Sequence, residues 1–287
     1  MSTSPEIHAT IARLFVYPVK SCAGVEVQEA LLIETGLEFD RAWMVVDTQG
    51  EFVSQRELPR MALIQPQLKH FEMVLRAPGM LALHIALDKV EQPTTVKVWN
   101  DTVKAYDMGD VAAQWFSDFL GQKLRLARFD PEQQRLSNKK WTGDVDAQNQ
   151  FADGFPLLVV SEASVAELND KLAAAGHAPV TVERFRANIV LAGLDAQDED
   201  RLAVMHISTP EGNVQLQGVK PCPRCPIPNI DPLTAVSSPT VGDMLQTYRR
   251  NAVVDGAVTF GTNAIILKGL EHGLRVGQTV QADYRFE

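Results

Sequence analysis

The chain has 287 residues, of which 45% are hydrophobic, so it can bury a sizeable core in one domain or two. Its formal net charge of −9 speaks against nucleic acid or an anionic membrane as a partner, because such binders usually carry clustered lysine and arginine. Three cysteines, an odd number in a long chain, fit a reducing compartment better than a disulfide framework.

The sequence contains no recognisable targeting or membrane segment. Residues 1–15 lack the basic region followed by an apolar region that marks a secretory signal. The longest apolar runs, such as 155–160, are far shorter than the roughly 20 residues of a membrane-spanning helix. We therefore expect a soluble, cytoplasmic protein.

The first part of the chain is predicted to consist mainly of short strands. Runs of β-branched or alternating residues recur at the spacing typical of β-barrels and sandwiches, at 11–19, 25–33, 42–47, 61–68, 73–77, 81–87, 94–99 and 103–107. The first clear helix follows them. Asp110 is its expected N-cap, Val111, Trp115 and Phe119 recur every four residues, and Gly121 ends it.

A polar stretch at 129–150 has almost no apolar periodicity. It predicts a domain boundary, or a mobile loop at that boundary. We accordingly expect an N-terminal β-barrel domain over residues 8–125 and a second domain over residues 126–287.

The second half is predicted to begin with a buried strand at 155–160 that leads directly into a helix. Ser164 and Glu167 have the spacing of a capping box, and Gly176 ends the helix. Further strands are predicted at 187–193, 202–208, 213–219, 263–269 and 279–286.

A second capping box, Thr240 with Asp243, predicts a short helix over 240–250. Together these elements predict a mostly β fold with some helices, of the α+β class, built from two barrel-like domains.

Cys222 and Cys225 form a C-x-x-C that is followed by Pro226 and Pro228. A zinc site needs about four ligands, but the remaining cysteine is Cys22 and no two histidines have H-x₃₋₅-H spacing. A thioredoxin-like pair sits at a helix N-terminus, which the two prolines disfavour. Both interpretations are therefore weakened.

The third interpretation is a single thiolate offered to another group. The prolines hold Cys225 in a rigid segment beside Arg224, and a fixed thiolate next to a guanidinium suits a soft transition metal. A buried structural cysteine in a proline-stiffened loop is the alternative, and the local sequence leaves both open.

Five sequence blocks occur in order: 17–43, with the motifs K-S-C and D-R-x-W, then 155–172, 184–191 with F-R-x-N, 220–232 and 260–267. Together they resemble the MOSC-domain family with its N-terminal β-barrel partner. More narrowly, they resemble the branch that contains the mitochondrial amidoxime-reducing component and its bacterial relatives. The resemblance covers nearly the whole chain.

This resemblance implies a molybdenum cofactor, in which a pterin dithiolene carries the metal and Cys225 is the protein ligand of molybdenum. Cys222 is then a neighbour rather than a ligand. An anionic cofactor in a negatively charged protein requires cations gathered locally. The residues implied to line its site are Lys20, Ser21, Arg41, Arg186, Arg224 and Asn263.

Ser161 and Ser164 lie at the start of a predicted helix, where free amides make an anion site. A structural role comes first for both residues, and Ser161 is the further candidate for a cofactor contact. This sequence also departs from the pattern of the family at three positions. Pro223 replaces a frequent serine, Asn263 replaces a tyrosine of some members, and Gln278 replaces a frequent acidic residue.

The implied activity is that of an oxidoreductase that reduces small N-hydroxylated compounds, N–OH to N–H plus water. Three cysteines cannot supply a Cys₄ iron–sulfur cluster, so we expect a separate ferredoxin- or flavin-type electron donor. The alternatives are a carrier of molybdenum cofactor or sulfur without turnover, and a β-barrel interaction protein with a degenerate site. Pyridoxal phosphate is associated with the family, but no lysine motif for it is visible.

Overall fold

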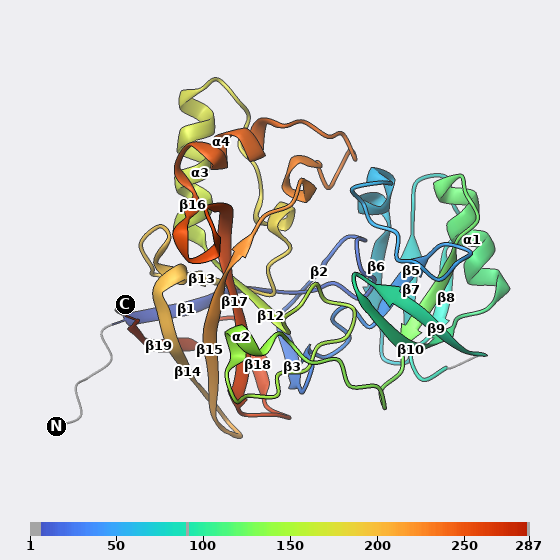
Figure 1. Ribbon diagram of the computed structural model, residues 1–287, viewed down its shortest axis with the longest axis horizontal. Helices are drawn as coiled ribbons and strands as arrows, with labels where there is room; N and C mark the ends of the chain where they lie inside the picture. Colours follow the sequence, from blue (N-terminus) through green and yellow to red (C-terminus); the bar gives the residue numbers. More distant parts are fainter. Residues whose placement is uncertain (1–6, 90–91, 286–287) are drawn as a thin grey trace.

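The computed structural model describes residues 7–89 and 92–285 and confirms a mostly β fold with some helices (Figure 1). Residues 1–6, which contribute to the argument against a secretory signal, lie outside the described residues, as does Phe286 at the end of the last predicted strand. Figure 1 shows two lobes, with α3 and α4 on one lobe and α1 on the other.

Seven strands of the larger lobe close into a barrel in the order β12-β13-β1-β19-β14-β15-β17, and β17 pairs back with β12. Closure leaves no free sheet edge, so the backbone is hydrogen-bonded around the whole barrel. The strands are β1 (Ile7–Val16), β12 (Leu157–Ser161), β13 (Ile189–Ala192), β14 (Leu202–Thr209), β15 (Gly212–Pro223), β17 (Ala257–Lys268) and β19 (Thr279–Tyr284).

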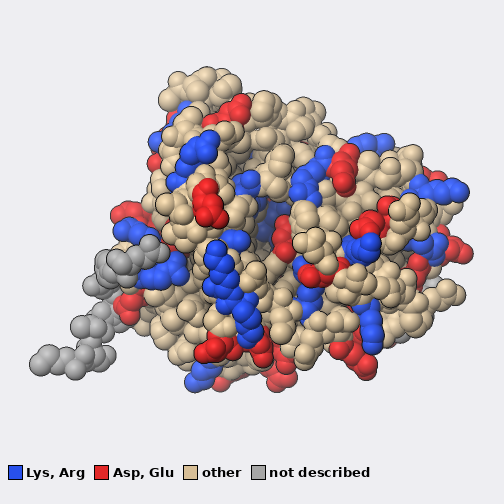
Figure 2. All heavy atoms as spheres, in the orientation of Figure 1, with Lys and Arg blue, Asp and Glu red and all other residues tan. Residues whose placement is uncertain are grey.

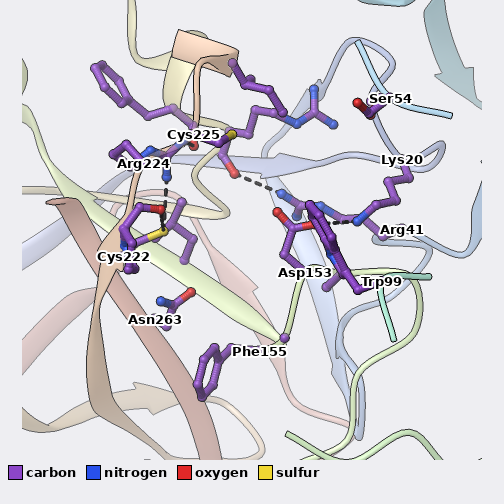
Figure 3. A pocket seen from close by; sticks show the side chains of 18 of the residues that line it. Lys20, Arg41, Ser54, Trp99, Asp153, Phe155, Cys222, Arg224, Cys225 and Asn263 are labelled. Atoms are coloured by element: carbon purple, nitrogen blue, oxygen red, sulfur yellow. Dashed lines mark hydrogen bonds and ion pairs between the residues drawn. The ribbon is translucent and has the colours of Figure 1, made fainter. Parts of the chain in front are cut away.

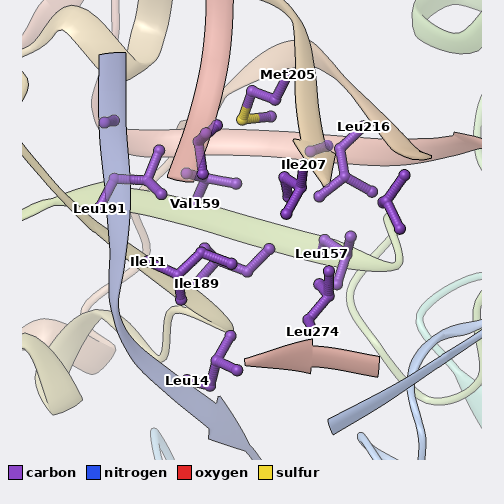
Figure 4. Close-up of a cluster of buried hydrophobic side chains, with 14 of the residues drawn as sticks. Ile11, Leu14, Leu157, Val159, Ile189, Leu191, Met205, Ile207, Leu216 and Leu274 are labelled. Atoms are coloured by element: carbon purple, nitrogen blue, oxygen red, sulfur yellow. The ribbon is translucent and has the colours of Figure 1, made fainter. Parts of the chain in front are cut away.

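The barrel interior is filled by aliphatic side chains that point inward from alternate strand positions (Figure 4). Residues far apart in sequence meet there, including Ile11, Val159, Leu191, Ile207 and Leu216, and all five are at most 1% exposed. Burial of this apolar surface is the main force that holds the barrel together.

Strand β1 belongs to this barrel, although it lies in the predicted N-terminal domain 8–125. In its register Leu14 lies opposite Ile189 of β13, and Ile7 lies opposite Ala282 of β19. Neighbouring short strands extend the same lobe: β2 (Val25–Val27) pairs with β1, and a small sheet contains β3 (Glu29–Ile33), β4 (Gly36–Leu37) and β18 (Gly273–Arg275). Strands β1 to β4 thus belong to the same lobe as the second half of the chain.

The second lobe consists of two antiparallel sheets and one helix around their own hydrophobic core. One sheet contains β5 (Trp43–Val46), β11 (Arg125–Phe129), β10 (Asp101–Asp107) and β9 (Gln92–Val98). The other contains β6 (Gln65–Leu68), β7 (Glu72–Arg76) and β8 (Leu83–Ala86), and the helix is α1 (Asp110–Leu120).

The remaining helices are α2 (Lys139–Thr142), α3 (Glu162–Ala174) and α4 (Thr240–Tyr248). The short strand β16 (Arg250–Asn251) pairs with β17. The 3₁₀ turns are η1 (Pro59–Leu63), η2 (Val182–Phe185), η3 (Asp198–Arg201), η4 (Ile227–Asn229) and η5 (Ala252–Val254). No helix among the described residues has both the length and the apolar character needed to cross a membrane.

The predicted helix starts need correction. The N-cap of α1 is Gly109 rather than Asp110, because the Asp110 carboxylate pairs with Arg125 instead of with the helix amides. In α3 the cap is Ser161, whose hydroxyl accepts from the amide of Ser164, so Ser164 lies inside the helix.

The capping box predicted for α4 is also wrong. Pro239 occupies the N-cap position, and the amide of Gly242 in the first turn donates to Asn229 Oδ1 (2.7 Å) rather than to a side chain of the predicted box, so Thr240 is the first helical residue. Proline is tolerated at a helix start because the amide it lacks would have no partner there.

The polar stretch at 129–150 is fixed by a buried guanidinium. Arg135 donates to the carbonyl oxygens of Gln150 (2.8 Å) and Ala152 (2.6 Å), and it pairs with Asp101 of the second lobe (2.7 Å). The side chain of Arg135 is 6% exposed. This stretch therefore joins the two lobes through hydrogen bonds rather than as a loose connection.

Candidate functional site

A cavity of about 120 Å³ opens where the two lobes meet. Figure 2 shows it as a hollow near the centre of the face in view, with basic side chains in and around it. Folding brings seven of the eight predicted site residues to its wall: Lys20, Ser21, Arg41, Arg186, Arg224, Cys225 and Asn263. The cysteine loop and Asn263 lie on one side, and Lys20 and Arg41 lie opposite (Figure 3).

Three of these residues have a left-handed backbone. The φ angles of Ser21, Arg41 and Arg186 are 70°, 51° and 58°. Residues other than glycine rarely adopt this conformation, and it is found at sites where the surrounding structure over-determines the backbone. Here the amide of Arg41 donates to the carbonyl of Tyr17 (2.8 Å), and that of Arg186 donates to the carbonyl of Glu183 (3.2 Å).

Arg41 is held by a buried carboxylate. Its Nη1 donates to Asp40 Oδ2 (2.5 Å), and its Nη2 donates to the carbonyl of Arg186 (3.0 Å). The Asp40 side chain is 1% exposed, and its other oxygen accepts from the amide of Tyr17 (2.8 Å). The guanidinium is thus positioned before any ligand arrives.

Two cations lie close together in this wall. The guanidinium carbons of Arg41 and Arg186 lie 4.4 and 4.3 Å from the ring centre of Tyr17. Burial, and then the like charge of Arg41, lower the pKa of Arg186 to about 10. An anion in the cavity would relieve this repulsion.

Lys20 is the third cation. It is 6% exposed, and its ammonium donates to the carbonyl of Phe151 (2.7 Å) and to Asp153 (2.5 Å). Burial lowers the pKa of Lys20, although the charge of Asp153 opposes that effect. Trp99 Nε1 donates to the same carboxylate (3.2 Å), so Asp153 joins the barrel lobe to the second lobe.

The two cysteines lie at the end of β15, Cys222 as its second-last residue and Cys225 two residues after it ends. Arg224 Nη1 donates to the sulfur of Cys222 (3.2 Å), and its Nη2 donates to the carbonyl of Phe185 (3.0 Å). Cys222 and Cys225 are both half-buried and both line the cavity, and Cys222 also packs against a hydrophobic cluster. The two prolines do not prevent every helical turn, because the three-residue 3₁₀ turn η4 begins at Ile227.

The three thiols differ in accessibility, which gives a testable prediction. Cys22 is fully buried and burial raises its pKa to about 12, whereas Cys222 and Cys225 are half-buried. Because the thiolate is the reactive form, we expect iodoacetamide to modify Cys222 and Cys225 in the folded, cofactor-free chain and to leave Cys22 intact. Intact-mass spectrometry with and without denaturant measures the count, and Cys22→Ala is the control.

The residues present fit an anionic group that carries a soft metal. Cys225 offers one thiolate, and five cationic side chains line the same cavity in a protein whose net charge is negative. Within residues 7–89 and 92–285, Nε of Arg224 is buried without a hydrogen-bond partner, so a donor remains unused in the wall. Arginine suits bidentate contacts with phosphate.

The two remaining candidates have different positions. Asn263 of β17 lies in the cavity wall and donates to the carbonyl of Lys220 (3.2 Å). Ser161 is not among the residues that line the cavity. It is fully buried, caps α3 and donates to the hydroxyl of Ser164 (2.9 Å), so the structure gives it the structural role.

Ser161 is connected through Ser164 to the buried carboxyl of Glu199. Ser164 Oγ donates to Glu199 Oε2 (2.8 Å), Glu199 is fully buried, and burial together with the charge of Asp200 raises its pKa. The folded protein therefore holds this proton at a pH at which the unfolded chain, with the ordinary value of 4.5, has released it.

We expect Glu199→Gln to remove this pH dependence. The wild-type contribution is fully present below pH 4.5 and falls by about 1.4 kcal/mol per pH unit above it, until the raised folded-state pKa is reached. The variant should therefore gain stability relative to wild type as the pH rises from 4.5. Urea unfolding at several pH values measures the difference, and a constant difference would contradict the expectation. Asp170→Asn, at an exposed position of α3, is the control.

The sequence reasoning missed other residues in the wall: Phe52, Ser54, Arg56, Trp99, Asp153, Phe155 and Asn188. The motif F-R-x-N contained a signal for Asn188, whose Oδ1 accepts from Arg41 (3.2 Å). Trp99 and Phe52 come from the second lobe, with their rings 4.8 Å apart. Nothing in the local sequence connects them with a loop more than 120 residues away, so only folding reveals them.

Family models match two parts of the chain, the MOSC N-terminal beta barrel domain over residues 8–123 and the MOSC domain over residues 146–281. Mitochondrial amidoxime reducing component 2 from Rattus norvegicus is 34% identical over 238 residues, which cover 79% of this chain and 68% of that protein. The Homo sapiens protein of the same name is 34% identical over 84% of this chain and 72% of its own length.

A second kind of relative is longer. Molybdenum cofactor sulfurase from Bos taurus is 32% identical over 270 residues. The match covers 88% of this chain and 30% of that protein, so it spans less than a third of the sulfurase.

Proposed function

The chain belongs to the family that joins a MOSC N-terminal β-barrel domain to a MOSC domain, and from this premise we propose its function. We propose that it is a molybdenum-cofactor-dependent reductase of N-hydroxylated compounds. One observation carries the proposal: the half-buried thiol of Cys225 faces a cavity whose wall contains Lys20, Arg41, Arg186 and Arg224. The family is related to the molybdenum cofactor, and the relatives named amidoxime reducing component suggest the substrate class.

In this proposal Cys225 supplies the sulfur ligand, and the neighbouring cations hold the anionic parts of the cofactor. Arg41 is fixed by Asp40, and Arg224 is fixed by the carbonyl of Phe185, so neither needs to reorganise on binding. When bound, the cofactor supplies a two-electron redox centre that can take up an oxygen atom. The protein orients it and excludes competing contacts.

The reaction consumes two electrons and two protons, since N–OH plus 2 H⁺ plus 2 e⁻ gives N–H plus H₂O. Among the cavity-lining residues, Lys20 and Asp153 form a hydrogen-bonded titratable pair. Because burial lowers the pKa of Lys20, its ammonium releases a proton more readily than a surface lysine does. We propose this pair as the local proton store, with electrons from a separate ferredoxin- or flavin-type protein.

The sulfurase relative supports a second candidate, a carrier of the cofactor or of sulfur on Cys225 without turnover of its own. Because this chain matches only 30% of the sulfurase, the remainder of that protein's activity need not apply here. The two candidates predict the same ligand but different chemistry, so a turnover assay separates them.

The test uses protein made in a host that synthesises the cofactor. Molybdenum is measured by elemental mass spectrometry and pterin by release, and a reduced viologen replaces the electron donor with an N-hydroxylated amidine as substrate. Near-stoichiometric metal and formation of the amidine are expected. Metal and pterin without amidine would favour the cofactor carrier. Neither metal nor pterin would overturn the reductase and the cofactor carrier, and would leave only the sulfur carrier.

A further inference from the structure

Trp99 stands at the tip of a hairpin, in a backbone conformation that tryptophan rarely adopts. Strands β9 and β10 pair up to Val98 and Asp101, so the loop between them has two residues, Trp99 and Asn100. The φ angle of Trp99 is 56°. The two-residue loops favoured in hairpins need a positive φ at their first position, where glycine, asparagine or aspartate is normally found. A bulky residue costs conformational energy there, so the turn itself gives no reason for an indole.

Burial in a core does not explain the indole either. Trp99 is 43% exposed, whereas Trp43 and Trp115 of the same lobe are 0% and 8% exposed. Trp99 is one of the residues that line the cavity between the lobes, and it lies on the side opposite the cysteines (Figure 3). Part of its ring surface is therefore accessible to a ligand of that cavity.

Three contacts fix this indole before any ligand binds. Its Nε1 donates to Asp153 Oδ1 (3.2 Å), and the guanidinium carbon of Arg56 lies 4.6 Å from its ring centre. The ring centre of Phe52 lies 4.8 Å from that of Trp99, at an interplanar angle of 59°. Arg56 and Phe52 also line the cavity. Trp99 and Phe52 thus form a fixed aromatic wall that the second lobe contributes.

The charge around this aromatic wall favours a further aromatic ring over an aliphatic group. The ammonium of Lys20 lies 5.5 Å from the ring centre of Phe52 and 6.0 Å from that of Trp99, and five cationic side chains line the cavity as a whole. Cations attract the negative face of a π system, and aromatic rings gain energy by packing against one another. A saturated group of the same size gains neither interaction.

We infer that Trp99 and Phe52 form an aromatic subsite, which selects substrates that carry a planar ring beside the N–OH group. The inference rests on the proposed function and narrows its substrate class to aryl N-hydroxylated compounds. The ring of the substrate packs against the accessible part of Trp99, and its N–OH group extends toward the side of the cavity that holds the cysteines. The second lobe thus supplies the specificity of a site whose thiol belongs to the barrel lobe.

Two compounds of similar size test the preference for a planar ring. Benzamidoxime and cyclohexanecarboxamidoxime carry the same head group on a flat and on a puckered six-membered ring. Their binding to the full chain, made in the cofactor-synthesising host, is measured by isothermal titration without an electron donor, so that no turnover occurs. Benzamidoxime is expected to bind about two- to tenfold more tightly, which is the range for one aromatic pair.

Three variants show whether Trp99 causes this preference. Trp99→Asn removes the ring and suits the left-handed position of the turn, so the hairpin should still form and the preference should disappear. Trp99→Phe loses the hydrogen bond to Asp153 but retains a ring, so it should keep part of the preference. Trp141→Leu removes a half-buried indole that is not among the described residues lining the cavity, and it should leave the preference unchanged.

The aromatic subsite is overturned if neither compound saturates the chain, if the wild type binds both equally, or if Trp99→Asn keeps the preference. It is also overturned if Trp99→Phe loses the preference as completely as Trp99→Asn, because Trp99 would then be only a hydrogen-bonded link between the lobes.

The same two compounds are then assayed for reduction with the viologen. A binding preference without reduction would support the aromatic subsite and contradict the reductase. Reduction of both compounds at equal kcat/KM, without a binding preference, would support the reductase and overturn the subsite.

Discussion

Cys225→Ser is expected to lower reductive turnover by more than about a hundredfold and to reduce or alter the bound metal, while Cys222→Ser keeps both near wild type. Changing a group that merely supports a metal ligand typically costs 10–100-fold, so replacing the ligand itself should cost more. Serine offers a hard oxygen where the metal prefers a soft thiolate. Turnover, molybdenum content and the visible spectrum of each purified variant are the measurements.

Cys222→Ser is a close control because Cys222, near the end of β15, is only three residues from Cys225, and both are half-buried and line the same cavity. Cys222 accepts from Arg224 (3.2 Å), a contact that a serine hydroxyl can also provide. Loss of metal in Cys222→Ser with retention in Cys225→Ser would contradict the proposal, because Cys222 would then be the metal ligand. Equal loss in both would indicate that the loop, rather than one sulfur, governs binding.

Arg41→Gln is expected to lower the free energy of unfolding by about 3 kcal/mol, the lower end of the range for breaking a buried ion pair. The substitution leaves the Asp40 carboxylate, which is 1% exposed, without its cation. The hydrogen bond from the amide of Tyr17 remains, which limits the loss. Urea denaturation of the cofactor-free chain measures the effect without a contribution from ligand binding.

The double variant Asp40→Asn with Arg41→Gln separates charge from packing. Because it removes both charges, it should be more stable than Arg41→Gln alone. Both variants should bind less cofactor than the wild type, because both lack the Arg41 guanidinium in the cavity wall. A double variant as unstable as the single one would show that the uncompensated carboxylate is not the cause.

The sequence by itself determined the class of fold and predicted seven residues of the wall of the cavity between the lobes. Strand spacing predicted the β-rich architecture, and the family resemblance carried by the ordered sequence blocks implied the seven residues that line the cavity. Those signals are local, because they depend on residue types and short spacings. Ser161 was different: its position at a predicted helix start favoured a structural role but left a cofactor contact open, and the structure shows that it caps α3.

Only the tertiary structure decided which segments share a wall. β1 joins the barrel of the second half, and Trp99 reaches Asp153 across the lobes, because long-range strand pairing and apolar burial, rather than neighbouring residues, fix these contacts. Whether a buried polar group finds a partner likewise depends on everything packed around it. No spacing in the chain predicts that Arg135 donates to the carbonyls of Gln150 and Ala152.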